Sequence, residues 1–266
     1  MFEFHKDKAR YFDIQYKTSK YHIIPFLKEN GVKVQGQHVL EIGCAEAGVL
    51  KGFLEEDCQC VGIELSASRV KLAKEFYRDH SDATRLTLIS ENIYDINPTE
   101  RFDSLFDIII LKDVIEHIHD HPRFFSEIHS FLKPDGIIFF GFPPWQMPFG
   151  GHQQIAQSKF LSKWIYVHLL PRFVYRSIMT LFGESETTQQ ELLEIAETGL
   201  SIEQFEKYSQ QARFEIKKRK LWITNPIYHY KFGVKIRSQL PLIRSLPYFR
   251  NFLTSCAYFI IGKSKA

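Results

Sequence analysis

One short segment, residues 39–48, constrains the fold of this chain more than any other. It reads as a buried strand that runs into a turn of small residues, GCAEAG at 43–48, and then into a helix. Small side chains at such a turn let the backbone approach a ligand closely. Residues 60–64 form a second apolar strand that ends in a carboxylate, Glu64. Because a carboxylate placed there can accept both hydroxyls of a ribose, the pattern predicts a nucleoside pocket at the carboxyl edge of a parallel sheet.

Two cofactor classes use this layout, and the details of the turn separate them. Dinucleotide folds carry G-x-G-x-x-G to seat a pyrophosphate, whereas the middle glycine of that pattern is Ala45 here. Two carboxylates, Glu41 and Glu46, flank the turn and would repel a pyrophosphate but attract a cationic amino group. At this point the chain resembles the class I methyltransferases that use S-adenosylmethionine, whose first motif is an acidic residue followed by a glycine-rich turn. Ala45 and Ala47 stand where that family usually has glycine, and alanine costs little there if its φ angle is negative.

The rest of the chain predicts an α/β fold of the doubly wound type, with a helix over residues 7–30 before the first strand. Strands are expected at 37–42, 60–64, 86–89, 106–111, 137–142, 214–223 and 256–261. The continuous apolar run at 106–111 is typical of a central strand covered on both faces. A loop rather than a crossover helix is expected between the last two strands, which resembles the antiparallel ending of class I methyltransferases. The expected sheet is therefore mostly parallel and seven-stranded, with an antiparallel last strand.

Three parts are expected along the chain. Residues 1–35 form an N-terminal helical cap, residues 36–144 and 200–266 the Rossmann-like methyltransferase domain, and residues 145–199 a helical lid inserted after the fifth strand. The segment 158–198 within this insertion is expected to be helical and is rich in aromatic residues. In the family that the chain resembles, such insertions often cover the acceptor site.

The resemblance implies a set of contacts to the cofactor. Glu41 would accept a hydrogen bond from the ammonium group of the cofactor, and Glu64 would accept hydrogen bonds from the ribose hydroxyls of the cofactor. Asn92 takes the position where the family usually has an aspartate for the adenine amino group, and an amide oxygen can accept the same bond without charge. The alternatives are a helix-terminus partner for Glu41 and a simple turn at Asn92. The whole expected set is Glu41, Gly43, Cys44, Ala45, Glu64, Leu65, Asn92, Ile93 and Lys112.

Methyl transfer from a sulfonium is an in-line displacement, in which a protein mainly aligns acceptor, methyl group and sulfur and excludes water. A general base helps only where the acceptor carries a proton that must leave. His152 follows two glycines at an expected exposed position, and His117 belongs to a Glu-His pair after the fourth strand that is common in the family. These two histidines are the candidate bases, and structural roles are the alternative for both. No metal is expected.

The net charge of +3 hides an asymmetry along the chain. From Lys207 onward there are thirteen lysines and arginines and one acid, Glu215, whereas the preceding part has an excess of acids. This excess of basic residues in the C-terminal third of the chain suggests an anionic partner. The alternative is that the basic residues belong to a solvated strand face and a lysine-rich loop. The sequence lacks the interleaved aromatic and basic residues of an RNA-reading module, which argues against nucleic acid. The expected partner is a small-molecule acceptor, anionic or hydrophobic, and contact of the apolar insertion with a membrane surface is a further interpretation.

Cysteine usage and hydropathy set the expected environment. Cys58 and Cys60 have the wrong spacing for a zinc knuckle and no second pair, so a reducing cytoplasm is the simplest setting. Residues 1–8 contain no apolar run typical of a signal peptide. No run of about 18 uncharged apolar residues predicts a membrane-spanning helix.

Three hypotheses about function follow, each of a different kind. The favoured one is a methyltransferase that moves a methyl group from S-adenosylmethionine to an oxygen of a small or lipid-like acceptor. A non-catalytic sensor or scaffold that binds S-adenosylmethionine or S-adenosylhomocysteine is the alternative, because Ala45 and Ala47 replace glycines and no single base stands out. An NAD(P)-dependent enzyme is the third, and the missing middle glycine argues against it.

Overall fold

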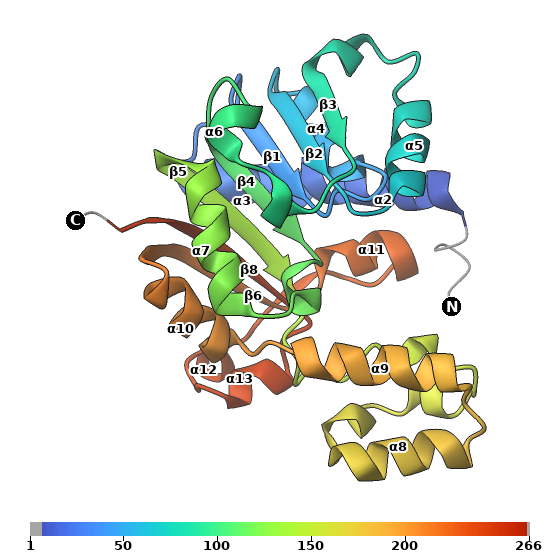
Figure 1. Ribbon diagram of the computed structural model, residues 1–266. Helices are drawn as coiled ribbons and strands as arrows, with labels where there is room; N and C mark the ends of the chain where they lie inside the picture. Colours follow the sequence, from blue (N-terminus) through green and yellow to red (C-terminus); the bar gives the residue numbers. More distant parts are fainter. Residues whose placement is uncertain (1–6, 265–266) are drawn as a thin grey trace.

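The computed structural model describes residues 7–264, which form one mixed sheet with helices on both faces and a separate pair of helices beside it (Figure 1). The strand order is β3-β2-β1-β4-β5-β8-β6-β7. Two expectations concern residues that lie outside this range. The absence of a signal peptide and the start of the N-terminal cap rest in part on residues 1–6, and the expected catalytic domain includes residues 265–266.

Five parallel strands make the first half of the sheet; four agree closely with the expected ranges, whereas β5 begins five residues earlier than the expected 137. They are β1 (His38–Ile42), β2 (Gln59–Ile63), β3 (Leu86–Ile89), β4 (Phe106–Lys112) and β5 (Leu132–Phe142). β1 lies between β2 and β4, so the strand order reverses there. Such a switch point opens a crevice at the carboxyl ends of the strands, which is where ligands bind in open α/β sheets.

The second half of the sheet reverses direction. β8 (Cys256–Lys263) runs antiparallel between β5 and β6 (Phe214–Thr224), so the expected antiparallel last strand is present. The predicted fold class is therefore confirmed. The predicted count of seven strands is wrong, because residues 7–264 form eight. The additional strand, β7 (Arg237–Ser238), pairs with the edge of β6 and is too short to leave an alternating pattern in the sequence.

The connection between β6 and β8 is more structured than the expected loop. It contains α11 (Pro226–Phe232), α12 (Pro241–Arg244) and α13 (Phe249–Phe252). α11 begins where the Asn225 side chain accepts a hydrogen bond from the backbone N–H of Ile227, with Pro226 at the first helical position. Asparagine followed by proline is a helix-start signal, and it places α11 beside the carboxyl edge of the sheet (Figure 1).

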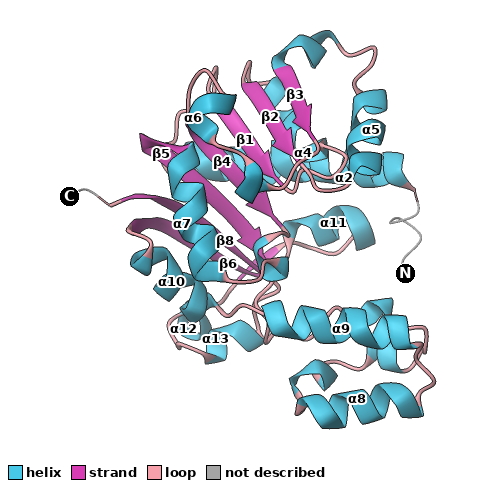
Figure 2. Ribbon diagram, in the orientation of Figure 1, coloured by secondary structure: helices cyan, strands magenta, loops and turns pink. Residues whose placement is uncertain are grey.

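Helices bury both faces of the sheet (Figure 2). On one face α7 (His121–Phe131) and α10 (Ile202–Gln211) contribute phenylalanines to a core that includes Phe125 and Phe205. On the other face the expected N-terminal helix forms as α2 (Lys8–Thr18), the π-helical turn η1 (Ser19–Ile23) and α3 (Ile24–Glu29). The remaining helices of the domain are α4 (Gly48–Leu54), α5 (Ala67–Phe76) and α6 (Pro98–Arg101).

Residues 145–199 have a small core of their own. The helices α8 (Arg172–Leu181) and α9 (Glu186–Thr198) pack with short turns around Leu161, Tyr175 and Met179. Residues 158–170, expected to be helical, instead form the 3₁₀ turns η6 (Leu161–Lys163) and η7 (Val167–Leu169), because Tyr166 takes a positive φ angle of 62° between them. The role of this segment as a lid and the domain boundaries stay predictions.

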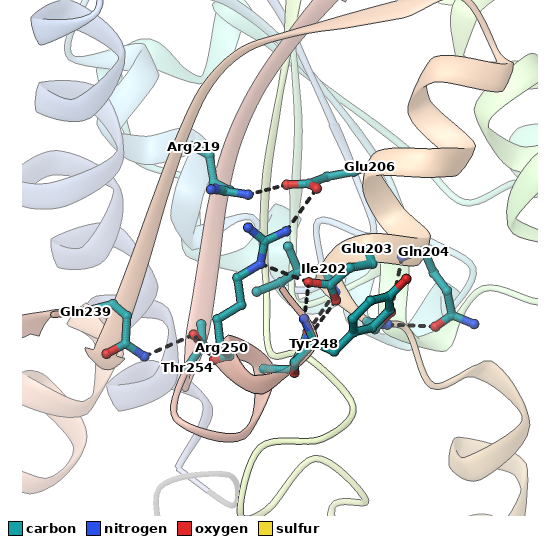
Figure 3. Close-up of polar contacts among 11 residues, drawn as sticks. Ile202, Glu203, Gln204, Glu206, Arg219, Gln239, Tyr248, Arg250 and Thr254 are labelled. Atoms are coloured by element: carbon teal, nitrogen blue, oxygen red, sulfur yellow. Dashed lines mark hydrogen bonds and ion pairs between the residues drawn. The ribbon is translucent and has the colours of Figure 1, made fainter. Parts of the chain in front are cut away.

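An ion-pair network fixes the α12–α13 segment to the rest of the domain (Figure 3). The Arg250 guanidinium lies 2.9 Å from a carboxylate oxygen of Glu203 and 3.0 Å from one of Glu206, both on α10. Glu203 also accepts a hydrogen bond of 2.6 Å from the Asn251 side chain. A buried arginine that pairs with two carboxylates fixes the position of the α12–α13 segment, which the sequence pattern predicted only as a loop. No helix within residues 7–264 is both long and apolar enough to cross a membrane.

Candidate active site

The turn after β1 is a tight, left-handed piece of backbone. Gly43, Ala45 and Ala47 all have positive φ angles, of 70°, 50° and 60°. A Cβ atom on Gly43 would lie 2.6 Å from Val114 Cγ2, so only glycine fits there. The two alanines do not meet the condition of a negative φ angle, and each therefore carries the left-handed penalty of about 1–2 kcal/mol. A strained turn of this kind persists only where its surroundings hold it.

Glu64, at the end of β2, holds this turn in place. One of its carboxylate oxygens accepts a hydrogen bond of 3.0 Å from the backbone N–H of Ala45, and the other accepts one of 2.9 Å from the N–H of Ser66. Two motifs that are about twenty residues apart in the sequence thus meet at one point. Each carboxylate oxygen keeps a further lone pair for a ligand hydroxyl. Leu65, which follows, exposes 72% of its surface.

Glu41 lies beneath the turn, at the carboxyl end of β1, and is almost completely buried. Its Oε2 atom has no hydrogen-bond partner among the described residues. Burial raises the pKa of Glu41 well above its usual value, and the charge of Glu64 adds to the shift while Lys112 opposes it. Burial likewise raises the pKa of the neighbouring Cys44 thiol. A buried carboxyl group with a raised pKa and an unpaired oxygen, next to a strained turn, is typical of a functional site.

Helix α2 closes one side of this pocket. A narrow cavity at the turn is lined by Tyr11 and Gln15 of α2, by Glu41 and by Lys112. A Cβ atom on Gly48, at the start of α4, would lie 2.5 Å from the carbonyl oxygen of Phe12, so the two helices are in direct backbone contact. The expected N-terminal cap therefore does lie over the turn.

Lys112, the last residue of β4, is buried and forms an ion pair with Asp113, which follows it and is partly exposed. Burial opposes the charge on Lys112, but Asp113 and the other groups around it raise its pKa above the usual value. The same pairing lowers the pKa of Asp113 against the effect of burial. Asp113 has a positive φ angle of 55°, and its backbone N–H donates to Gly141 of β5. The Lys112 side chain therefore lies at the carboxyl edge of β4, among the residues of the candidate site.

Asn92 and Ile93 lie after β3, where the adenine contact is expected. Asn92 is exposed, and its side-chain oxygen accepts a hydrogen bond of 3.2 Å from the N–H of Tyr94, which starts the short turn η3 (Ile93–Asp95). Ile93 is buried in the main core. Asn92 is thus a turn cap with one oxygen available at the surface, and its role toward a cofactor stays a prediction.

The two candidate bases lie next to each other, although they are far apart in the sequence. His117 is in the turn η4 (Ile115–His117) after β4, and His152 precedes the turn η5 (Gln153–Ile155) after β5. Their ring centroids are 5.0 Å apart. Burial lowers the pKa of His152 to about 4 and also lowers that of His117. His152 is only partly exposed, in contrast to the expected open position, because Gly151 packs against His168.

Sequence reasoning missed two residues of this site. Glu116 is 5% exposed and lies beside both histidines, and burial together with Asp113 raises its pKa well above the usual value. Lys231 of α11 is also close to Asp113, and burial lowers its pKa to about 8. The Glu-His pair drew attention to His117 rather than to Glu116. Lys231 lies in a segment expected to be a loop, and only the Asn-Pro helix start could have placed it.

Known proteins share part of this sequence. A family model described as a methyltransferase domain matches residues 14–164, which is more than half of the chain. The ubiquinone biosynthesis O-methyltransferase of Rhodopseudomonas palustris (strain TIE-1) is 33% identical over 107 residues, which are 40% of this chain and 39% of that protein. The protein of the same name from Coxiella burnetii (strain Dugway 5J108-111) is 27% identical over 112 residues, 42% of this chain and 46% of that protein. The chain thus matches less than half the length of these curated relatives.

Solved structures share the fold at low sequence identity. An S-adenosylmethionine-dependent methyltransferase from Clostridium acetobutylicum has a TM-score of 0.57 and 12% identity, covering 94% of this chain and 92% of its own. Phosphoethanolamine N-methyltransferase 2 from Haemonchus contortus has a TM-score of 0.58 and 16% identity, covering 97% of this chain and 57% of its own. At these identities the likeness concerns the fold alone, and it agrees with the sheet order described above.

Proposed function

The chain belongs to the family of methyltransferase domains, and from that premise we propose that it transfers the methyl group of S-adenosylmethionine to an oxygen of a small or lipid-like acceptor. The observation that carries the proposal is the meeting of Glu64 with the Ala45 backbone above the buried Glu41. The O-methyltransferase names of the curated relatives support oxygen as the acceptor atom.

The charges at the turn fit a cationic cofactor. Glu41 has a buried oxygen without a described partner, and the ammonium group of S-adenosylmethionine is a suitable one. Glu64 would hold the ribose hydroxyls with the lone pairs that its two backbone hydrogen bonds leave free. The remaining cofactor residues proposed are Gly43, Cys44, Ala45, Leu65, Asn92, Ile93 and Lys112. When bound, this cofactor supplies an electrophilic methyl group on a positively charged sulfur.

The chain's own groups must position the acceptor and receive its proton. His117 and His152 have lowered pKa values, so both are neutral near pH 7 and each keeps a ring nitrogen that can accept a proton. They lie at the carboxyl edge of β4 and β5, next to the ion pair of Lys112 and Asp113. We assign deprotonation of the acceptor hydroxyl to this histidine pair. The contact of helix α9 with η4 supports the proposal that residues 145–199 exclude water from the acceptor.

Calorimetry with S-adenosylmethionine, S-adenosylhomocysteine and NAD⁺ tests the cofactor. We expect binding of the first two and none of the third. Release of S-adenosylhomocysteine with a panel of phenols and catechols, with and without alkyl tails, then tests the reaction. Binding without turnover on the whole panel would favour the alternative of a non-catalytic sensor, for which the strained Ala45 and Ala47 are the supporting observation.

A lipid-like acceptor would bring the protein to a membrane surface, and the α12–α13 segment is the surface that suits this contact. Leu242, Tyr248 and Phe249 expose 74%, 71% and 51% of their surfaces. A groove beside them is lined by basic side chains, among them Lys218 and Arg244. Apolar side chains next to basic ones match an anionic bilayer surface.

Vesicle flotation tests this contact. We expect binding to vesicles that contain phosphatidylglycerol, weaker binding to vesicles of phosphatidylcholine alone, and loss of binding in Leu242→Ser. Leu181→Ser changes a similarly exposed leucine on α8, in the insertion for which the sequence suggests membrane contact, so comparing the two variants tells the two surfaces apart. Equal flotation of Leu242→Ser and the wild type would count against the segment.

A further inference from the structure

Three side chains that ligate metals in other proteins gather at the carboxyl edge of β4 and β5. Glu116, His117 and His152 each place one oxygen or nitrogen atom so that all three atoms lie within 4.8 Å of one another. They come from the two turns that follow neighbouring parallel strands, and the pairing of Lys112 with Gly141 sets those turns side by side. The tertiary fold therefore assembles this cluster from residues about 35 positions apart.

The Glu116 carboxylate is the observation that points to a ligand. The residue is 5% exposed, and neither of its oxygens has a hydrogen-bond partner among the described residues. A buried carboxylate is costly unless it is paired or coordinates a metal. Lys112 does not serve as its partner, because its ammonium group pairs with Asp113 instead. The unpaired oxygens of Glu116 therefore lie close to the two imidazoles.

The two histidines are free to act as ligands, and the backbone around His152 holds that residue in place. Within residues 7–264 neither imidazole makes a hydrogen bond through its ring nitrogens. His152 has a positive φ angle of 52°, and the two preceding glycines are required, since a Cβ atom on Gly150 would lie 2.0 Å from the Trp145 carbonyl oxygen. A strained backbone that positions a polar side chain is a common feature of functional sites.

We propose that Glu116, His117 and His152 bind a divalent first-row transition metal ion, with an open position for the oxygen of the acceptor. Two imidazoles and one carboxylate are a ligand set of catalytic zinc sites, which keep one position open. Two nitrogen ligands among three also favour such an ion over Mg²⁺. This proposal rests on the proposed methyl transfer and departs from the expectation that no metal is involved.

A bound ion would change the role of the two histidines from bases to ligands. The acceptor hydroxyl loses its proton to solvent water when its oxygen binds the ion, because a divalent cation lowers the pKa of a bound O–H group. The oxygen then forms a bond to the methyl carbon, the carbon–sulfur bond breaks, and its electron pair stays on the sulfur. The products are the methyl ether and neutral S-adenosylhomocysteine. No further reactant is needed.

The cluster must tighten to hold an ion. Ligand atoms around a tetrahedral zinc ion lie about 3.3 Å apart, given metal–ligand distances of about 2.0–2.1 Å. The atoms of the cluster are within 4.8 Å of one another, so rotations that move them by about 1–1.5 Å are enough. His117 is exposed at the end of a 3₁₀ turn and has the room to make such a rotation.

Direct metal binding tests the site without any methyl transfer. The metal-free protein is titrated with Zn²⁺ by calorimetry and with Co²⁺ by visible absorption, and Mg²⁺ is the comparison ion. We expect one ion per chain, the intense absorption of cobalt in a site of low coordination number, and at least tenfold weaker binding of Mg²⁺. Glu116→Gln and His152→Asn should each weaken Zn²⁺ binding at least tenfold. His119→Gln, which changes an exposed histidine two residues from the site, should bind like the wild type.

Several results would overturn the proposal. One is the absence of stoichiometric Zn²⁺ binding to the wild type. Another is Zn²⁺ binding by Glu116→Gln and His152→Asn that is as tight as in the wild type. Circular dichroism and cofactor calorimetry check that both variants are folded. Full methyl transfer by chelator-treated protein would overturn the role of the ion in the reaction. Stoichiometric Zn²⁺ binding without any methyl transfer would instead support the metal site and count against the proposed function, so the two failures are distinguishable.

Discussion

Glu64→Ala should separate the structural role of this carboxylate from its role in cofactor binding. In the folded protein the carboxylate accepts two backbone hydrogen bonds, of 3.0 Å from Ala45 and 2.9 Å from Ser66. Hydrogen bonds to a charged group contribute about 1.5–3 kcal/mol each, and two at the lower value total about 3 kcal/mol. Because Glu64 is partly exposed, water can bind the two backbone N–H groups in the variant and offset part of this roughly 3 kcal/mol. We therefore expect a net loss of about 2 kcal/mol in the free energy of unfolding.

The assay has two readouts. Thermal denaturation should show a Tm lower by about 4–8 °C, since about 1 kcal/mol shifts a domain of this size by about 2–4 °C. Calorimetry with S-adenosylmethionine should show affinity at least about tenfold weaker, which corresponds to the loss of one charged hydrogen bond of about 1.4 kcal/mol. Glu64→Gln keeps one acceptor oxygen, so its Tm and its affinity for S-adenosylmethionine should lie between those of the wild type and Glu64→Ala. Glu75→Ala, which removes an exposed carboxylate of α5, is the control.

A folded Glu64→Ala protein that binds S-adenosylmethionine as tightly as the wild type would refute the reasoning. Glu64 would then be only a support of the turn, and the ribose hydroxyls would have to be held by another group. A lower Tm with unchanged affinity is the specific pattern that would lead to this conclusion.

Three further predictions concern stability. Ala45→Gly should stabilise the fold by about 0.5 kcal/mol in chemical denaturation, because relief of about 1–2 kcal/mol of left-handed strain exceeds the added entropy of the unfolded chain. Arg250→Met should destabilise the fold by about 3 kcal/mol in the same assay, since it leaves Glu203 and Glu206 without their shared partner. Stability should also fall as the pH decreases from about 6.5 to about 4, in part because burial lowers the pKa of His22 to about 4. The unfolded chain takes up this proton first, so His22→Asn should flatten that part of the pH profile.

Each of these predictions has a matched control. Ala73→Gly, at a buried position inside α5, should lower stability by about 1 kcal/mol or more, because no positive φ angle is relieved there. Arg244→Met changes an exposed arginine of α12 and should have little effect. His119→Gln, at an exposed histidine, is the control for the pH profile. Destabilisation by Ala45→Gly, or equal effects of the two arginine variants, would contradict the packing described here.

The local part of the fold could be predicted from the sequence. The ranges of β1 to β4 agree with expectation to within about one or two residues, because short apolar runs bounded by turn residues carry the signal for buried strands. The sequence also carries the start signal of α10, because Ser201, the residue before the helix, forms a capping box with Gln204. The strand–turn–helix motif followed by Glu64 also indicated the family, because its residues are close together in the chain.

Other features could not be predicted, because their causes are not local. β7 has only two residues and exists because the edge of β6 offers it hydrogen bonds. The positive φ angles of Ala45 and Ala47 belong to the folded turn, in which Ala45 donates a hydrogen bond to Glu64 and the flanking Gly43 and Gly48 pack against Val114 and α2, whereas residue type alone favours negative values. Glu116 gave no signal beyond the Glu-His pair, since an unpaired buried carboxylate is visible only once the chain is folded.

Local sequence is enough to specify which segments are strands and helices, which residues follow the carboxyl ends of the strands, and which family the chain resembles. These are properties of neighbouring residues, because hydrophobic periodicity and turn chemistry act over a few positions. Folding of the whole chain was needed for Glu64 to support the turn, for α2 to cover it, and for Glu116, His117 and His152 to meet. Contacts between distant residues depend on strand order and on the burial of whole faces, and no local pattern contains that information.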